Sequence, residues 1–311
     1  MPERKKLSEL NLTDKFLFDE TTEDFAAYEA LVSVLLENDV HFLTQPETEK
    51  EYRLSPELRQ IRLDVIAMDE NKELYYTEMQ KLNTGNLIKR SRYYQAQIDV
   101  SLLPPGERNF NRLNNSCMIL IAPFDLFGRK LYRYTFEGTC RECTDLKLND
   151  GSKRVFINLH GQNREDFSDE FLEMMEYIEH TTDAVAQKVH SKRIKLIHNK
   201  VNNIKLSEKT GVKYMQHWEE LAEAKDEGIA EGRAEGRVEG RALGRAEGAT
   251  KNVITLIIKK IKKNKSVDTI ADELEQDVDY VRSICDIAEK FAPDYNCEEI
   301  FNAVWKNIKE Q

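Results

Sequence analysis

The stretch RLDVIAMDENKELYYTEMQK, residues 62–81, decides the fold of the first half of this chain. Arg62 to Met68 and Glu73 to Gln80 have the composition of two strands, and a polar turn separates them. Alternate residues of a strand share a face, so an antiparallel pairing puts the even-numbered Asp64 and Glu78 on the same face. The spacing predicts that the two carboxylates lie opposite each other or one diagonal step apart.

Two facing carboxylates need a physical reason. At a Cβ separation of roughly 5 Å they repel each other and destabilise a bare hairpin, so a cation between them is the usual explanation. Acidic residues on the solvated face of a hairpin are a common alternative. The metal is favoured because the neighbouring strand residues are largely apolar, and a charge inside such a sheet is costly: Leu63, Val65, Ala67, Leu74, Tyr76 and Met79.

The order of these residues resembles a known family. A lone Asp64 on one strand, followed by Glu78-Met79-Gln80 on the next, is similar to the PD-(D/E)XK nuclease pattern. The match looks closest to the bacterial nuclease-like transposases of the recombination-promoting (Rpn) group, which often have Gln where the general motif has Lys. The supporting segments are Thr13 to Phe18 (TDKFLF), Ile61 to Val65 (IRLDV), Thr77 to Gln80 (TEMQ) and Lys89 to Gln97 (KRSRYYQAQ).

The resemblance implies a metal-dependent nuclease site. Asp64 and Glu78 would bind Mg²⁺ or Mn²⁺, together with a backbone carbonyl near Met79, and the metal would activate the attacking water. Gln80 would orient the water or the phosphate, but a neutral amide adds no positive charge. Additional metal ligands in such folds would be Asp14 and Glu29, although both also fit ordinary surface positions.

The resemblance also implies double-stranded DNA as the partner. The formal net charge of −10 is unfavourable for phosphate binding, so local basic clusters matter more. One cluster opens the helix after the Glu78 strand, and its residues would contact the DNA backbone: Lys89, Arg90, Arg92 and Tyr94, with Tyr93 and Gln97 on the same helix. A solvated helix face is the alternative interpretation.

The expected fold class is α/β. The resemblance implies a restriction-endonuclease-like core (helix, three strands, helix, strand) with a long all-helical C-terminal extension. The expected core helices are Thr22 to Glu37, capped by Thr22, and Leu87 to Leu102. The expected strands are Glu49 to Leu54, Arg62 to Met68, Glu73 to Gln80, Cys117 to Ala122, Leu131 to Glu137 and Arg154 to Leu159. The later helices are expected at Phe167 to His180, Thr182 to Asn199 and Ser207 to Lys225.

A tetrad repeat, EGIAEGRAEGRVEGRALGRAEG, runs from Glu227 to Gly248 with Gly at every fourth position. Each interior glycine costs a helix about 1 kcal/mol relative to Ala. The segment is therefore either a flexible tether or a helix whose glycine ridge packs closely on another helix, in this chain or in a second copy. Beyond it, two short helices about Gln276, the first capped by Ser266, resemble a helix-turn-helix. The second helix is too acidic to read DNA, so a helical packing module is favoured.

Four parts are expected along the chain. They are a nuclease-like domain (1–165), a helical extension (166–226), the repeat as helix or tether (227–250) and a small helical module (251–311). The N-terminus is charged where a signal peptide is apolar, and no apolar run is long enough for a bilayer, so a cytoplasmic location is expected. Cys140 and Cys143 could form half of a zinc site with His160; reduced thiols are the default interpretation.

The sequence therefore predicts a Mg²⁺-dependent DNA endonuclease of the PD-(D/E)XK type, associated with transposition or recombination. A homo-oligomer through the glycine-rich helix is a further expectation. The alternative is a DNA-binding or protein-interaction protein that retains the nuclease fold with weak or no activity. The neutral Gln80 and the acidic net charge support that alternative.

Overall fold

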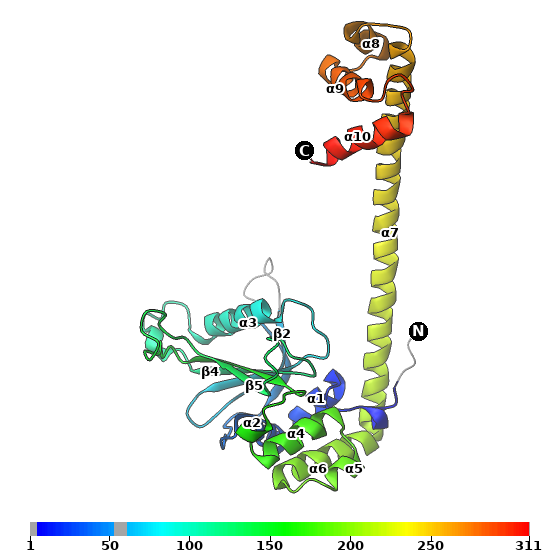
Figure 1. Ribbon diagram of the computed structural model, residues 1–311. Coiled ribbons are helices and arrows are strands. Elements are labelled where there is room, and N and C mark those ends of the chain that lie inside the picture. Colours follow the sequence, from blue (N-terminus) through cyan, green and yellow to red (C-terminus); the bar gives the residue numbers. More distant parts are fainter. Residues whose placement is uncertain (1–4, 53–60, 311) are drawn as a thin grey trace. The chain divides into compact units, whose positions relative to one another are not determined.

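A computed structural model describes residues 5–52 and 61–310 (Figure 1). The chain divides into two compact units, Met1–Trp218 and Glu219–Gln311. The first contains the sheet, and the second is helical. No helix in the described ranges combines the length and the apolar character that a membrane span requires.

The first unit is built on a six-stranded sheet of order β1-β2-β3-β4-β6-β5. The β1·β2, β2·β3 and β5·β6 pairs are antiparallel, and the β3·β4 and β4·β6 pairs are parallel. The strands are β1 (Glu47–Tyr52), β2 (Ile61–Met68), β3 (Leu74–Met79), β4 (Ser116–Ala122), β5 (Arg133–Phe136) and β6 (Ser152–Asn158). Residues 53 and 54 of the expected first strand lie outside the described ranges.

Helices cover both faces of the sheet. They are α1 (Lys15–Thr22), α2 (Phe25–Leu36), α3 (Leu87–Leu102), α4 (Asp169–Glu179), α5 (Asp183–Ala186) and α6 (Lys192–Leu206), with short 3₁₀ turns at Leu7–Glu9, Phe110–Arg112 and Arg164–Asp166. Figure 1 shows α3 on one face and α1, α2, α4 and α6 on the other.

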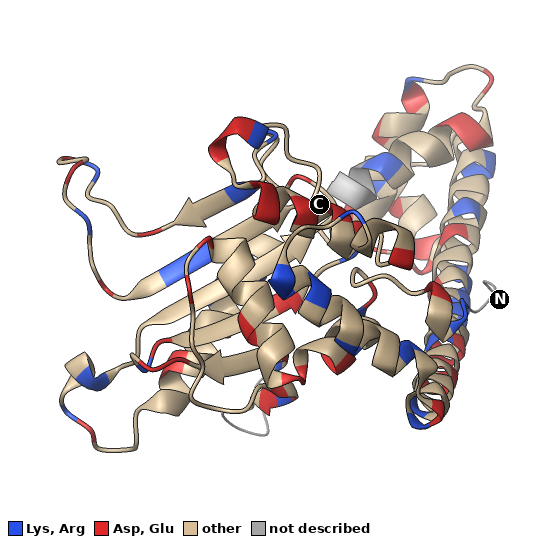
Figure 2. Cartoon of the chain, turned by 90° about the horizontal axis from the view of Figure 1, so that it is seen from below, with Lys and Arg blue, Asp and Glu red and all other residues tan. Residues whose placement is uncertain are grey.

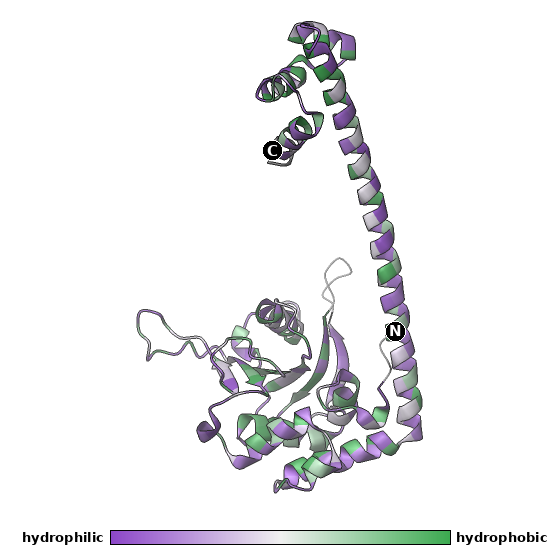
Figure 3. Ribbon diagram, turned by 45° about the vertical axis from the view of Figure 1, so that its right-hand side comes forward, coloured by the Kyte–Doolittle hydropathy of each residue, from purple (hydrophilic) through white to green (hydrophobic). Residues whose placement is uncertain are grey.

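The alternation of side chains along the strands separates two cores. On β4, Met118 and Leu120 pack with Leu87 and Ile98 of α3, whereas the odd-numbered residues pack with α1, α2, α4 and α6. All residues of β3 and β4 are buried, as expected for central strands covered on both faces. Figure 3 shows the hydrophobic residues concentrated in these central strands.

Two helix boundaries differ from expectation. The helix expected at Thr22 to Glu37 is α2, which begins later, at Phe25, and α1 before it was not expected. The cap of α2 is Asp24, whose carboxylate accepts a hydrogen bond from the Ala27 amide at 3.0 Å. A carboxylate caps a helix at least as well as a threonine hydroxyl, so the assignment of Thr22 as the cap was wrong. The hydroxyl of Thr22 instead donates to the carbonyl of Phe18.

The helix expected at Thr182 to Asn199 is also broken. Ser191 has an extended ψ of 129° and its hydroxyl accepts a hydrogen bond from the Ile194 amide, which starts α6 as a separate helix. Helices α4 and α6 lie in the same core as α1 and α2, so the chain has no structural break at residue 165.

Helix α7 (Glu208–Ile261) includes the whole tetrad repeat. Apart from the helix's own nearby backbone, no atom of the described residues would lie within 4 Å of a Cβ placed on Gly228, Gly232, Gly236, Gly240, Gly244 or Gly248. The structure therefore favours a helix over a tether for this segment, and its glycine ridge is open within the described chain. Acidic and basic residues follow one another along this helix (Figure 2).

The second unit has its own apolar core. The last turns of α7 pack with α8 (Val267–Leu274), α9 (Val278–Glu289) and α10 (Cys297–Glu310). Ser266 caps α8 by accepting a hydrogen bond from the Thr269 amide, as predicted. Helix α10 was not expected from the sequence; its side chains Ile300, Phe301 and Val304 complete this core.

Candidate active site

Asp64 and Glu78 meet where β2 and β3 stop pairing. Val65 pairs with Thr77, which makes Asp64 and Glu78 the next two residues in register. The Asp64 amide donates to Oε1 of Glu78 at 3.2 Å, and the Met79 amide donates to Oδ2 of Asp64 at 2.8 Å. The two residues are only 4% and 2% exposed. The predicted opposition of the two residues in register is confirmed and both are buried, but the regular alternation that would put them on one face does not hold at Asp64.

The backbone is irregular at the same point. On either side of Asp64, Leu63 and Val65 pair with β1, but the opposing Glu49 has φ = 51°, a left-handed conformation that is unusual for a residue with a side chain. Leu63 and Ile66 belong to the same core although they are three positions apart. The alternation of β2 therefore changes at Asp64, which turns its carboxylate toward α1.

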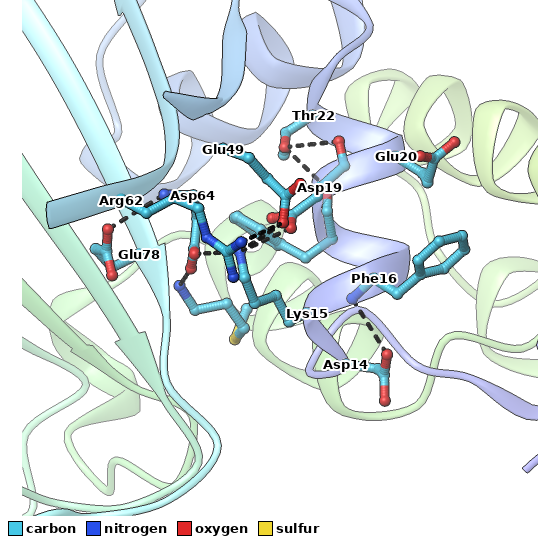
Figure 4. Close-up of polar contacts among 12 residues, drawn as sticks. Asp14, Lys15, Phe16, Asp19, Glu20, Thr22, Glu49, Arg62, Asp64 and Glu78 are labelled. Carbon is cyan, nitrogen blue, oxygen red and sulfur yellow. Dashed lines mark hydrogen bonds and ion pairs between the residues drawn. The ribbon is translucent and has the colours of Figure 1, made fainter. Parts of the chain in front are cut away.

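Helix α1 brings a lysine to this carboxylate (Figure 4). Nζ of Lys15 lies 2.5 Å from Oδ1 of Asp64 and 2.7 Å from Oδ2 of Asp19. The Lys15 and Asp19 side chains lie on one side of the helix because they are four residues apart. Oε1 of Glu49 is 3.9 Å from the same ammonium and 3.8 Å from Nη1 of Arg62. The site therefore contains an acidic network around one lysine.

Helix α3 approaches the site from the other face of the sheet. Nη2 of Arg90 lies 3.9 Å from Oε2 of Glu78, and the amide of Gln80 donates to the same oxygen at 3.2 Å. The guanidinium of Arg90 also lies over the ring of Tyr94, 5.5 Å from its centroid. The structure thus places Gln80 and Arg90 beside Glu78, and Tyr94 beside Arg90.

The remaining candidates on α3 lie elsewhere. Lys89 and Arg92 are exposed, and within the described ranges neither has a contact with the Asp64–Glu78 pair. Gln97 is buried, so it does not face a nucleic-acid backbone as the sequence had suggested. Its position on the helix places it on the side that packs on the sheet.

Asp14 and Glu29 are used for local structure. Asp14 caps α1 by accepting a hydrogen bond from the Phe16 amide at 3.3 Å, and Figure 4 shows it directed away from Asp64. Glu29 accepts hydrogen bonds from the Phe42 amide at 3.0 Å and from His41. We therefore leave both residues out of the metal site proposed below.

Sequence reasoning missed Lys15, Asp19 and Glu49. Lys15 and Asp64 are 49 positions apart, and no periodic pattern connects a helix residue to a distant strand. The available signal was the Lys–Asp pair at positions i and i+4 in KFLFD, beside the segment that carries the family resemblance.

The burial of these groups perturbs their protonation. Burial, followed by the charge of Asp64, raises the pKa of Asp19 to about 8, against the lowering effect of Lys15. Burial and then the charge of Asp64 hold the pKa of Glu78 well above its ordinary value. Burial lowers the pKa of Lys15, but the charges of Asp64 and Asp19 outweigh it, so the ammonium stays protonated. A single lysine neutralises one carboxylate, so burial favours the protonated forms of the other two acids.

The cysteine pair forms no metal site with His160. Nε2 of His160 lies 2.8 Å from Glu179, while the Cys140 and Cys143 thiols lie beside Glu142 and Asp145. Across the described ranges, no three His, Cys, Asp or Glu side chains are grouped closely enough to hold a metal by themselves.

Comparison with known proteins identifies the family. A family model for the PD-(D/E)XK nuclease family transposase matches residues 29–227. The chain belongs to this family. No curated protein and no solved structure matches it. The span matched by the PD-(D/E)XK transposase model includes Asp64, Glu78, Gln80 and α3, whereas Lys15 and Asp19 precede it.

The residues present fit the divalent metal that this nuclease family generally uses. Carboxylate oxygens are the ligands that hard divalent cations prefer. Oδ1 of Asp19 is buried with no hydrogen-bond partner among the described residues, and the nearest cationic group to Glu78 is Arg90, beyond hydrogen-bond distance. The site thus has acidic oxygens in excess of the cations that the described residues provide.

Proposed function

We propose that this protein is a metal-dependent DNA endonuclease that hydrolyses phosphodiester bonds and acts in transposition or recombination. The observation that carries the proposal is the pair of buried carboxylates, Asp64 and Glu78, at the point where the pairing of β2 with β3 ends. Membership of the PD-(D/E)XK nuclease family transposases supports it. A DNA substrate also agrees with the cytoplasmic location expected from the sequence.

In this proposal, Asp64 and Glu78 hold Mg²⁺ or Mn²⁺. Because the side chains alone form no group of three ligands in the described chain, backbone carbonyls and water complete the coordination. When bound, the metal polarises the scissile phosphate and lowers the pKa of a water molecule. The Asp64 and Met79 amides fix the two carboxylates in place, and the Gln80 amide fixes Oε2 of Glu78.

In this proposal, helix α3 binds the DNA backbone. Lys89 and Arg92 are exposed there, and Arg90 is half-buried beside Glu78 with Tyr94 against its guanidinium. Lysine and arginine side chains neutralise phosphates, which supplies most of the sequence-independent affinity for DNA. Such a local patch outweighs a net charge of −10 spread over the whole chain.

Plasmid nicking tests the proposal. With Mg²⁺ or Mn²⁺ the wild type is expected to convert supercoiled plasmid to the open circle. Asp64→Asn and Glu78→Gln are expected to lower the rate by at least about a hundredfold, because each removes a charge that the reacting centre needs. Glu51→Gln, an exposed residue on β1, is the control. Unchanged nicking by Asp64→Asn would refute the assigned site.

A nuclease fold without useful activity is the second candidate. The neutral Gln80 at the position of the motif lysine, together with the acidic net charge, favours it. A wild-type protein that binds duplex DNA in a gel-shift assay, but nicks no plasmid with either metal, would support this candidate and exclude the first.

We also propose that α7 associates with a second copy of the chain. Successive helix residues are 100° apart, so the Glu row and the Arg row lie on either side of the Gly row. With the Gly rows facing in a parallel pair, the Arg row of one helix lies beside the Glu row of its partner. An antiparallel pair brings like charges together. The charge pattern therefore favours a parallel dimer with closely approaching backbones.

A further inference from the structure

At the third position of the motif this chain has the neutral Gln80 instead of a lysine. A cationic side chain reaches the site from another element, helix α1. The amide of Gln80 is neutral and is engaged with Oε2 of Glu78 at 3.2 Å. Nζ of Lys15 lies 2.5 Å from Oδ1 of Asp64. Among the described residues, no other cationic side chain lies within hydrogen-bond distance of the Asp64 or Glu78 carboxylate. Lys15 comes from α1, which precedes the span matched by the family model.

The position of Lys15 is fixed by the fold. Asp14 caps α1 immediately before Lys15, and the next three residues, Phe16, Leu17 and Phe18, are buried in the core of the first unit. Asp19 holds the ammonium at 2.7 Å from the next turn of the same helix. A helix anchored in this way keeps the lysine directed at Asp64 at little entropic cost.

Lys15 is also reachable by a substrate. Its side chain is 34% exposed, whereas the side chains of Asp64 and Glu78 are 6% and 3% exposed. Of these three side chains, that of Lys15 is therefore the one open to a phosphodiester that approaches from the surface. Because Asp19 binds Lys15 independently of Asp64, the ammonium remains at the site when Asp64 has another partner.

We propose that Lys15 supplies, from α1, the positive charge at the reacting phosphate that the neutral Gln80 cannot supply. This assignment rests on the proposed nuclease function. Its chemistry is electrostatic: negative charge builds up on the phosphate oxygens as the water attacks, and a fixed ammonium stabilises it. Gln80 then has the separate role of holding the Glu78 carboxylate.

Two substitutions test the assignment. Lys15→Met keeps the length of the side chain and removes its charge, and is expected to lower plasmid nicking by about a hundredfold or more. Adding Gln80→Lys to Lys15→Met returns a cation to the site from β3 and is expected to restore at least about a tenth of the wild-type rate. Lys50→Met is the matched control, because Lys50 lies on β1 with the same 34% side-chain exposure and pairs with Glu47.

The affinity for Mn²⁺, measured by calorimetry on the DNA-free protein, provides a readout that does not depend on activity. Lys15→Met is expected to bind Mn²⁺ as tightly as the wild type or more tightly, because a competing cation has been removed from Asp64. Loss of Mn²⁺ binding together with nicking would show that Lys15 only maintains the site, and would overturn the proposal. Lys15→Gln, which retains a polar end, replaces Lys15→Met if circular dichroism shows that the latter does not fold.

The remaining outcomes distinguish a failure of the role proposed for Lys15 from a failure of the proposed nuclease function. An active wild type and an equally active Lys15→Met variant would refute the role of Lys15 and leave the nuclease intact. Nicking lost in Lys15→Met but not recovered by Gln80→Lys, with Lys15→Arg also inactive, would mean that positive charge alone is not the requirement. A wild type without nicking would refute the proposed function and this assignment with it.

Discussion

At the residue scale, the distinctive feature is one lysine shared by two buried acids. The ammonium of Lys15 contacts both Asp19 and Asp64, but it can neutralise only one of them. Burial then favours the protonated form of the other acid, which is why the pKa of Asp19 rises to about 8. Glu78, buried beside Asp64, shows a shift in the same direction. The metal-free site is therefore expected to be under electrostatic stress near neutral pH.

This stress predicts a pH dependence of stability. Between the ordinary pKa of 3.8 and the folded value of about 8, Asp19 keeps a proton that the unfolded chain has lost. The folded state then binds more protons, so the free energy of unfolding falls as pH rises through this window, by up to about 1.4 kcal/mol per pH unit for each retained proton. Asp19→Asn should flatten this decline in urea titrations with EDTA present.

Glu23→Gln, an exposed position just after α1, is the control and should leave the decline unchanged. A decline in Asp19→Asn as steep as that of the wild type would show that Asp19 is ionised throughout the window.

At the element scale, regular segments could be predicted and their exceptions could not. The alternation in residues 62–81 and the apolar spacing of α3 predicted β2, β3 and α3 to within about two residues. The irregularity at Asp64 was hidden, because it depends on the conformation of Glu49 in the neighbouring strand. The cap of α2 was misassigned since Thr22 and Asp24 are both good capping residues and only packing decides between them.

The repeat in α7 gives a prediction about association. Replacing Gly236 and Gly240 with Leu should lower the dimer fraction measured by light scattering, because the added bulk prevents close approach of the two backbones. The same substitution should increase helicity in circular dichroism, since Leu is favoured over Gly by about 0.8 kcal/mol per residue in a helix. Among the described residues, no atom beyond the helix's own nearby backbone lies within 4 Å of a Cβ placed at either position.

Ala234→Leu with Ala242→Leu adds similar bulk to the opposite side of the helix and should leave the dimer intact. If light scattering gives the same molar mass in solution for the Gly236→Leu, Gly240→Leu variant as for the wild type, the glycine ridge is excluded as the interface.

At the scale of the whole molecule, the chain has two units with separate cores. The helices expected to form an extension beyond residue 165 instead complete the core of the first unit, where Phe171 and Ile194 are fully buried. The sequence could not show this, because an amphipathic helix indicates that a face is buried but not what buries it. The four expected parts thus correspond to two units.

The separate cores predict independent stability. Ile257 is fully buried in the core of the second unit, and Ile257→Ala should destabilise that unit by about 2–5 kcal/mol. Calorimetry should show an earlier transition for the second unit, while Mn²⁺ binding at Asp64 is unchanged. Leu256→Ala, at a neighbouring position that is 37% exposed, should have a smaller effect. Loss of Mn²⁺ affinity in Ile257→Ala would show that the two units are coupled.

The hydrogen bonds at the end of the β2–β3 ladder provide a direct spectroscopic reporter. The amides of Asp64 and Met79 donate to carboxylates rather than to backbone carbonyls. Their chemical shifts and hydrogen-exchange rates should therefore respond to protonation or cation binding at the two acids, whereas amides inside the ladder should not. Two peaks in an amide NMR spectrum would then titrate with Mg²⁺ in the resting protein, with neither DNA nor turnover required.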